Sequence, residues 1–190
     1  MIGGDASAPA GEYNSAAEVV EALSDIEHGI QTIGVACYPE GHPSISDASL
    51  LEALRRKQPH VDYMVSQLCF DSGAITSWLD KLRAEGIALP LHLGIAAPMQ
   101  VSELAAISLR IGVGSSVRYL TKQDGFGGNL PRGTSYRPED TYRPEDLLYE
   151  MGDAVSAKEA GIERLHLFTF NQVAATVDWQ AGLTGVAAGV

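Results

Sequence analysis

The sequence predicts an α/β protein with a parallel sheet, because short apolar segments alternate with amphipathic helical patterns along the chain. The apolar segments are nearly continuous rather than strictly alternating, which is typical of parallel strands covered by helices. Polar residues, prolines and glycines follow these segments, at the edge where both doubly wound sheets and (β/α)8 barrels hold ligands. These observations locate a ligand site and leave the two architectures open.

Four apolar segments have the length of strands. They lie at Thr32–Cys37, Tyr63–Phe70, Leu89–Ile95 and Arg164–Phe170. Each is followed by residues that typically end a strand. These are Tyr38-Pro39-Glu40-Gly41-His42, Asp71, Ala97-Pro98 and Asn171-Gln172.

Helical patterns separate these strands. Apolar residues recur at a spacing of three or four in Ser15–Asp25, Ser49–Lys57 and Ile75–Glu85. One or two further helices and a long loop follow the third strand, and Pro144 and Gly161 delimit a helix over Pro144–Ala160. We expect residues 1–180 to form one domain, and the Ala/Gly-rich residues 181–190 to form a short, flexible tail.

Composition narrows the function classes. The 190 residues carry 24 acidic and 13 basic side chains, a net charge of −11, which disfavours sequence-independent nucleic-acid binding. Two cysteines, Cys37 and Cys69, are too few for a disulfide framework or a thiolate zinc site. The sequence shows no signal segment and no apolar run of membrane-spanning length, so we expect a cytoplasmic protein without a metal site.

Several residues at or near the strand ends are candidates for chemistry. The rigid segment Tyr38–Pro43 presents an aromatic ring, a carboxylate and an imidazole, although a stiff turn that caps the next helix would have the same composition. Gly4 would let the backbone approach a ligand closely, with the Asp5 carboxylate beside it. The alternative is that these residues form a simple turn. Lys57 ends a helix, where a cation also stabilises the helix dipole. Gln67 is either a core amide or a ligand-reading side chain.

Five segments together resemble the methylenetetrahydrofolate reductase family in order and spacing. They are Gly3-Gly4-Asp5, Tyr-Pro-Glu-Gly-His-Pro at 38–43, Ser66-Gln67-Leu68-Cys69-Phe70-Asp71, Leu93-Gly94-Ile95 and His166-Leu167-Phe168-Thr169-Phe170-Asn171. The resemblance covers about residues 1–172. It implies a partial (β/α)8 (TIM) barrel, with about four βα units that correspond to the C-terminal half.

The resemblance also implies an activity. Members of this family bind FAD at the carboxyl ends of the strands, reduce it with NAD(P)H, and convert methylenetetrahydrofolate to methyltetrahydrofolate. By resemblance, Asp5 is the catalytic carboxylate near flavin and folate. Gly4, Tyr38, His42 and Lys57 match FAD-binding positions. Gln67 matches an amide that reads the folate or nicotinamide, and Gln172 falls where the family often has a substrate-binding arginine.

The match begins at the end of the family's fourth strand. The first three strands, with the glutamate proposed to activate the folate, have no counterpart in this sequence, and a full barrel needs about 250 residues. We therefore expect weak or no reductase activity from this chain alone. The alternatives are a non-catalytic folate- or flavin-binding half-barrel that pairs with a copy or a partner, and a chain whose gene start is misplaced.

Overall fold

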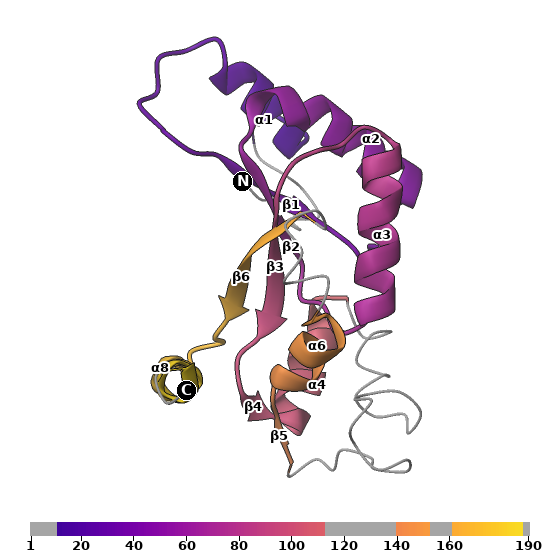
Figure 1. The fold of residues 1–190 in the computed structure, drawn as a ribbon. Helices are drawn as coiled ribbons and strands as arrows, with labels where there is room; N and C mark the ends of the chain where they lie inside the picture. The colour runs from indigo at the N-terminus through magenta and orange to yellow at the C-terminus, as the bar shows by residue number, and fades with distance from the viewer. Residues whose placement is uncertain (1–10, 113–139, 153–160, 188–190) are drawn as a thin grey trace.

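The computed structural model describes residues 11–112, 140–152 and 161–187, with side chains described up to residue 183. The elements follow one another as strands alternating with helices (Figure 1). They are α1 (Ala16–Leu23), β1 (Gly34–Cys37), α2 (Asp47–Lys57), the 3-10 turn η1 (Gln58–His60), β2 (Tyr63–Ser66), α3 (Ser72–Ala84), β3 (Leu91–Ala96), β4 (Met99–Gln100), α4 (Val101–Arg110), β5 (Thr141–Tyr142), α6 (Glu145–Glu150), β6 (Ile162–Phe168) and α8 (Val173–Ala187).

The main sheet has four parallel strands in the order β1-β2-β3-β6. Its register pairs Cys37 with Ser66 at one end of the sheet, and Ala96 with Phe168 on the two later strands. Consecutive parallel neighbours joined through helices are the repeating unit of a (β/α)8 barrel. The predicted α/β class is confirmed, and the sheet has the form of a partial barrel.

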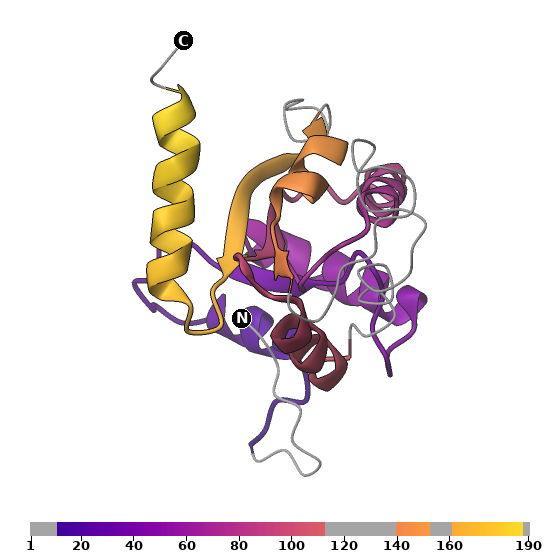
Figure 2. The ribbon, with the colours of Figure 1, turned by 90° about the horizontal axis from the view of Figure 1, so that it is seen from below.

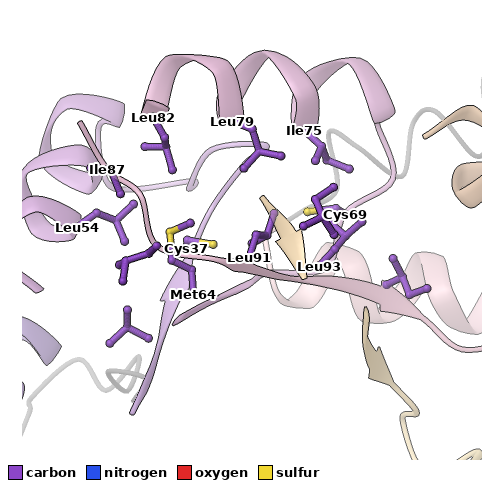
Figure 3. Close-up of a cluster of buried hydrophobic side chains, with 14 of the residues drawn as sticks. Cys37, Leu54, Met64, Cys69, Ile75, Leu79, Leu82, Ile87, Leu91 and Leu93 are labelled. Carbon is purple, nitrogen blue, oxygen red and sulfur yellow. The ribbon is translucent and has the colours of Figure 1, made fainter. Parts of the chain in front are cut away.

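Helices α2 and α3 cover one face of this sheet. The main core lies between these helices and the sheet. Leu54 comes from α2, and Ile75, Leu79 and Leu82 form the buried face of α3 (Figure 3). The strands contribute alternate residues to the same core. These include Val35, Cys37, Met64, Leu91 and Leu93. Removing this apolar surface from water stabilises the layered arrangement.

The helix starts follow from local hydrogen bonds. The side chain of Ser46 accepts a hydrogen bond from the backbone N–H of Ser49 at the start of α2, and Asp71 accepts one from Ala74 at the start of α3. Both are N-cap interactions that satisfy donors at a helix start. Three basic residues in the last turn of α2, Arg55, Arg56 and Lys57, lie at the negative end of its dipole.

The bounds of all four predicted strands change. The first strand begins at Gly34 instead of Thr32, and the third runs over Leu91–Ala96 instead of Leu89–Ile95. The apolar run Tyr63–Phe70 forms a strand only as far as Ser66, although Leu68, Cys69 and Phe70 are buried and the Cys69 N–H still donates to the Gly94 carbonyl at 3.0 Å. The last strand runs over Ile162–Phe168 instead of Arg164–Phe170. It ends where Phe170 and Asn171 adopt positive φ angles of 45° and 67°, which turn the chain out of the sheet.

The residues expected to form a C-terminal tail are partly helical. The chain continues after β6 as α8, which crosses the expected boundary at residue 180 and extends to Ala187. An Ala/Gly-rich composition is compatible with a helix, because a glycine inside a helix costs only about 1 kcal/mol and the neighbouring alanines favour the helix. Helix α8 lies beside β6 and away from the other helices in both views (Figures 1 and 2).

The predicted helix Pro144–Ala160 is described only in part. Its first half forms α6, Glu145–Glu150, while residues 153–160 lie outside the described part of the chain. A two-stranded antiparallel sheet, β4 with β5, precedes α6 and was not predicted. In the described ranges, no helix combines the length and the apolar character needed to cross a membrane.

Candidate functional site

The candidate site lies at the carboxyl edge of the main sheet. Backbone hydrogen bonds continue past the strand ends: Gln67 N–H donates to the Cys37 carbonyl at 2.9 Å, and Ala97 N–H donates to the Phe168 carbonyl at 3.1 Å. These hydrogen bonds extend the pairing of neighbouring strands into the first residues of the following loops. The loops after β1 and β2 are therefore held side by side where the sequence predicted ligand-binding residues.

The loop after β1 is a tight turn. Gly41 N–H donates to the Tyr38 carbonyl at 3.0 Å, and Gly41 adopts a φ of +84°, a conformation that favours glycine. Pro39 is buried within the turn. The turn brings the Tyr38 and His42 rings together edge to face, with centroids 5.0 Å apart and planes at 86°. Two of the predicted flavin-binding residues are thus neighbours.

One ring nitrogen of His42 is already engaged. The backbone N–H of Ser44 donates to His42 Nδ1 at 3.2 Å. A neutral imidazole that accepts through Nδ1 carries its proton on Nε2. His42 can therefore present an N–H donor to an acceptor outside its own loop.

A cavity of about 220 Å³, which we call the sheet hollow, lies against the face of the sheet opposite α2 and α3. The small residues Gly34 and Ala36 form the base of this cavity, and larger side chains surround it. The larger lining residues include Tyr38, Tyr63, Gln67, His166 and Phe168. Aromatic rings around a few polar atoms are typical of sites that hold planar ligands.

Gly94 preserves the shape of this hollow. A Cβ on Gly94 would lie 2.4 Å from the Ser66 carbonyl oxygen and 2.6 Å from the Phe168 ring. Beside it, the Gly94 N–H donates to Ser66 Oγ at 2.7 Å. Glycine at this position lets β2, β3 and the Phe168 ring approach one another closely.

Gln67 comes from the end of β2 and lines the sheet hollow. Its side-chain Oε1 accepts a hydrogen bond from the backbone N–H of Leu68 at 3.3 Å. The carboxamide is therefore oriented with its oxygen toward the backbone, and its NH2 group supplies the donors that a ligand would meet. This assignment rests on the usual distinction of amide oxygen and nitrogen by hydrogen-bond partners.

Lys57 lies on the other side of β1. It is only 7% exposed, and its Nζ donates to the Ala36 carbonyl at 3.3 Å. It lines a smaller cavity of about 50 Å³ between α2 and α3, which we call the helix hollow, together with Tyr38, Trp78 and Lys81. Tyr38 borders both hollows, so it connects the Lys57 side of β1 with the Gln67 side.

Burial changes the acidity of the groups around Lys57. Desolvation lowers the pKa of Lys57 below its ordinary value of 10.5. Desolvation also raises the pKa of the buried Cys37 thiol, so Cys37 stays protonated and behaves as a core residue. Within the described residues, no carboxylate forms an ion pair with Lys57, which leaves its charge available to an anion.

The remaining predicted residues are not brought into this group. Gln172 is exposed and lies in the turn before α8, where its N–H donates to the Thr169 carbonyl at 2.7 Å and its carbonyl accepts from Thr176. It lines neither hollow. Gly4 and Asp5 lie outside the described residues.

His166 and Phe168 belong to a segment that carries the family resemblance but were not predicted as site residues, although both line the sheet hollow. Their spacing of two residues on a strand places them on the same face, and this period could have identified them. In the part of the chain that the structure describes, no group of three or more His, Cys, Asp or Glu side chains is arranged to hold a metal ion.

Comparison with known proteins agrees with this geometry. The family model described as "Methylenetetrahydrofolate reductase" matches residues 2–113, which is more than half of the chain. Methylenetetrahydrofolate reductase 1 of Schizosaccharomyces pombe is 28% identical over 145 residues, covering 73% of this chain and 22% of the yeast protein. Methylenetetrahydrofolate reductase 2 of Saccharomyces cerevisiae is 25% identical over 150 residues, with the same shares covered.

The chain thus spans about 22% of the length of these curated relatives. The matched residues include β1, β2 and β3 and the loops that carry Tyr38, His42, Lys57 and Gln67. By its sequence match and its parallel βα units, the chain belongs to the methylenetetrahydrofolate reductase family.

Proposed function

We propose that this chain contributes the flavin- and folate-binding strand ends of a methylenetetrahydrofolate reductase. The proposed reaction is the reduction of 5,10-methylenetetrahydrofolate to 5-methyltetrahydrofolate with FAD and with NAD(P)H as electron donor. The proposal extends to a role in one-carbon metabolism and methionine synthesis and to a cytoplasmic location. The observation that supports it most is that Tyr38 borders both the helix hollow, which Lys57 lines, and the sheet hollow, which Gln67 lines.

The residues present fit a flavin dinucleotide. A flavin needs apolar and aromatic walls for its ring system, polar groups at the ring edge and a cation for its pyrophosphate. The sheet hollow supplies Tyr38, Phe168 and the Gln67 amide, and the helix hollow supplies a buried ammonium group without a carboxylate partner among the described residues. FAD, when bound, would supply hydride transfer between the nicotinamide donor and the folate.

The chain's own residues would act as follows. Lys57 would bind the pyrophosphate by charge, and His42 would donate a hydrogen bond through Nε2–H. Gln67 would orient the folate or nicotinamide through its amide NH2 group. Asp5, at the expected end of the preceding strand, would be the carboxylate that tunes the flavin and the substrate. Gly4 would allow close backbone approach there, and Gln172 would contact substrate.

A binding experiment with two lysine variants tests this proposal. FAD is titrated into the purified chain while flavin fluorescence is followed, for the wild type, Lys57→Met and Lys81→Met. Lys81 lines the same cavity and is exposed, so it is a matched control. We expect Lys57→Met to weaken binding at least tenfold, about 1.4 kcal/mol, and Lys81→Met to change it less than threefold. Equal losses would contradict the assignment of Lys57.

An activity assay separates catalysis from binding. NADH oxidation with menadione as acceptor is measured on the chain loaded with FAD. We expect weak or no turnover, because the chain spans only about 22% of the length of the curated relatives it matches. FAD binding without turnover would favour the non-catalytic half-barrel, and robust turnover would overturn the expectation of impaired activity.

A further inference from the structure

The carboxylate of Glu40 joins two loops of the candidate site. Its Oε1 accepts hydrogen bonds from the backbone N–H groups of Phe70, at 2.5 Å, and Asp71, at 2.8 Å. Glu40 belongs to the loop after β1, whereas Phe70 and Asp71 lie about thirty residues later in the loop after β2. Each of these loops carries candidate ligand-binding residues.

The position of Glu40 in its turn connects this bridge to the site. Glu40 lies between Tyr38 and His42, and the turn is closed by the hydrogen bond from Gly41 N–H to the Tyr38 carbonyl. On the other loop, Phe70 and Asp71 follow Gln67 by three and four residues. A displacement of the Glu40 carboxylate would therefore move Tyr38 and His42 relative to Gln67.

Burial and charge make this bridge costly to break. The Phe70 side chain is fully buried, and Glu40 is half-buried, so water cannot freely replace the lost acceptor. A carboxylate that accepts backbone N–H bonds forms stronger hydrogen bonds than a neutral acceptor does. The two N–H groups also precede the start of α3, where negative charge is stabilised by the helix dipole.

We propose that Glu40 is a positioning residue that sets the Tyr38–His42 turn against the strand end bearing Gln67, before any ligand binds. Glu40 acts through the backbone of the next loop and is not itself a catalytic residue. The identity of the ligand rests on the proposed function, whereas the bridging role does not.

The test compares Glu40→Ala and Glu40→Gln with the control Asp71→Ala. Asp71→Ala removes a different contact in the same loop, the side-chain cap on the Ala74 N–H, and leaves the Asp71 backbone donor to Glu40 in place. Amide hydrogen exchange is measured first, in the ligand-free protein. We expect Glu40→Ala to speed exchange of the Gly41 N–H by about tenfold or more, because the turn that the Gly41 N–H closes loses its hydrogen bonds to the Phe70 and Asp71 N–H groups.

Glu40→Gln keeps an oxygen acceptor and is expected to show a smaller increase, so it preserves the test if Glu40→Ala does not fold. Asp71→Ala should leave Gly41 exchange within about twofold of the wild type. Unchanged Gly41 exchange in both Glu40 variants would overturn the proposal, whatever the protein binds. The proposal would also be overturned if Asp71→Ala speeded Gly41 exchange as much as Glu40→Ala does while lowering the melting temperature by the same amount. Glu40 would then contribute only to overall stability.

FAD titration is the second readout. We expect Glu40→Ala to raise the FAD dissociation constant about tenfold. Asp71→Ala, compared at a similar melting temperature, should raise it less than threefold. A wild-type chain that binds no FAD, together with faster Gly41 exchange in Glu40→Ala, would reject the proposed function and support the positioning role. Normal FAD affinity in Glu40→Ala would instead reject the positioning role while the proposed function stands.

Discussion

Lys57 shows how a single buried cation can be retained at a cost in stability. Its ammonium is nearly inaccessible, and the backbone carbonyl of Ala36 is the hydrogen-bond acceptor that the structure gives it. Taking a charge out of water is unfavourable unless it is paired, and this lowers the pKa of Lys57. A bound anion would provide the missing partner of the Lys57 ammonium. The unfavourable burial of this charge therefore supports a role of Lys57 in anion binding.

This burial predicts a pH-dependent effect of Lys57→Met. The lysine's pKa is lower in the folded chain than its ordinary 10.5, so between these two pKa values the unfolded chain binds more protons. The charge therefore destabilises the fold fully below the folded pKa, and the effect disappears as the pH rises through 10.5. Without ligand, we expect Lys57→Met to raise the free energy of unfolding at pH 7 by about 1 kcal/mol.

Urea unfolding of both proteins at pH 7 and near pH 10.5 measures this. The advantage of Lys57→Met should shrink at the higher pH, and Lys81→Met should show no such trend because Lys81 is exposed. An advantage of the same size at both pH values would mean that burial of the charge is not its cause.

Gly94 carries the second residue-level prediction. A methyl group there would press on the Ser66 carbonyl oxygen at 2.4 Å and on the Phe168 ring, and the backbone oxygen cannot move cheaply. We expect Gly94→Ala to destabilise the fold by about 1–3 kcal/mol, as overpacking of a close-packed interior does. Urea unfolding at neutral pH measures the change, and wild-type stability would show that the strands have room to separate.

The elements were predicted well where apolar spacing reports packing. The patterns in Ser49–Lys57 and Ile75–Glu85 correspond to α2 and α3, whose apolar faces contact the sheet. The pattern failed where a buried apolar run continues beyond the strand end, as in Leu68–Phe70, and where composition alone was used, as in α8. Tyr38, His42 and Gln67 were predictable because they follow strands, whereas the Glu40 bridge needed the relative placement of two loops.

Helix α8 carries an element-level prediction. Gly182 lies inside it, and no atom lies within 4 Å of the position that a Cβ would take. Gly182→Ala should therefore stabilise α8 by about 0.5–1 kcal/mol, through the helix preference of alanine alone. Slower amide exchange across α8 would support this, and unchanged exchange would indicate that the segment is not helical in solution.

At the scale of the whole molecule, the described sheet presents apolar groups along its β6 side. Leu165 on β6 is 38% exposed, and Val173, Val177 and Leu183 on α8 are also exposed. β6 is an outer strand of this sheet, and outer strands with apolar neighbours promote association. We propose that the chain associates with itself through this side.

Sedimentation velocity tests this association. We expect a concentration-dependent shift to larger species that Val177→Lys reduces. Tyr149→Lys is the control, since Tyr149 is 80% exposed on α6, which lies apart from α8 (Figure 2). A well-dispersed monomer at tens of micromolar would contradict the prediction, and an equal effect of Tyr149→Lys would assign the association to another surface.

We propose that the carboxyl edge of the parallel sheet binds a flavin between the Lys57 and Gln67 sides of Tyr38. Backbone amide chemical shifts recorded during a titration with FAD test this most directly. We expect saturable shifts concentrated at Tyr38, His42, Gln67 and His166, with little change at His60, which precedes the amino end of β2. Saturable binding whose shifts leave all four of these residues unmoved, or no binding at all, would contradict it.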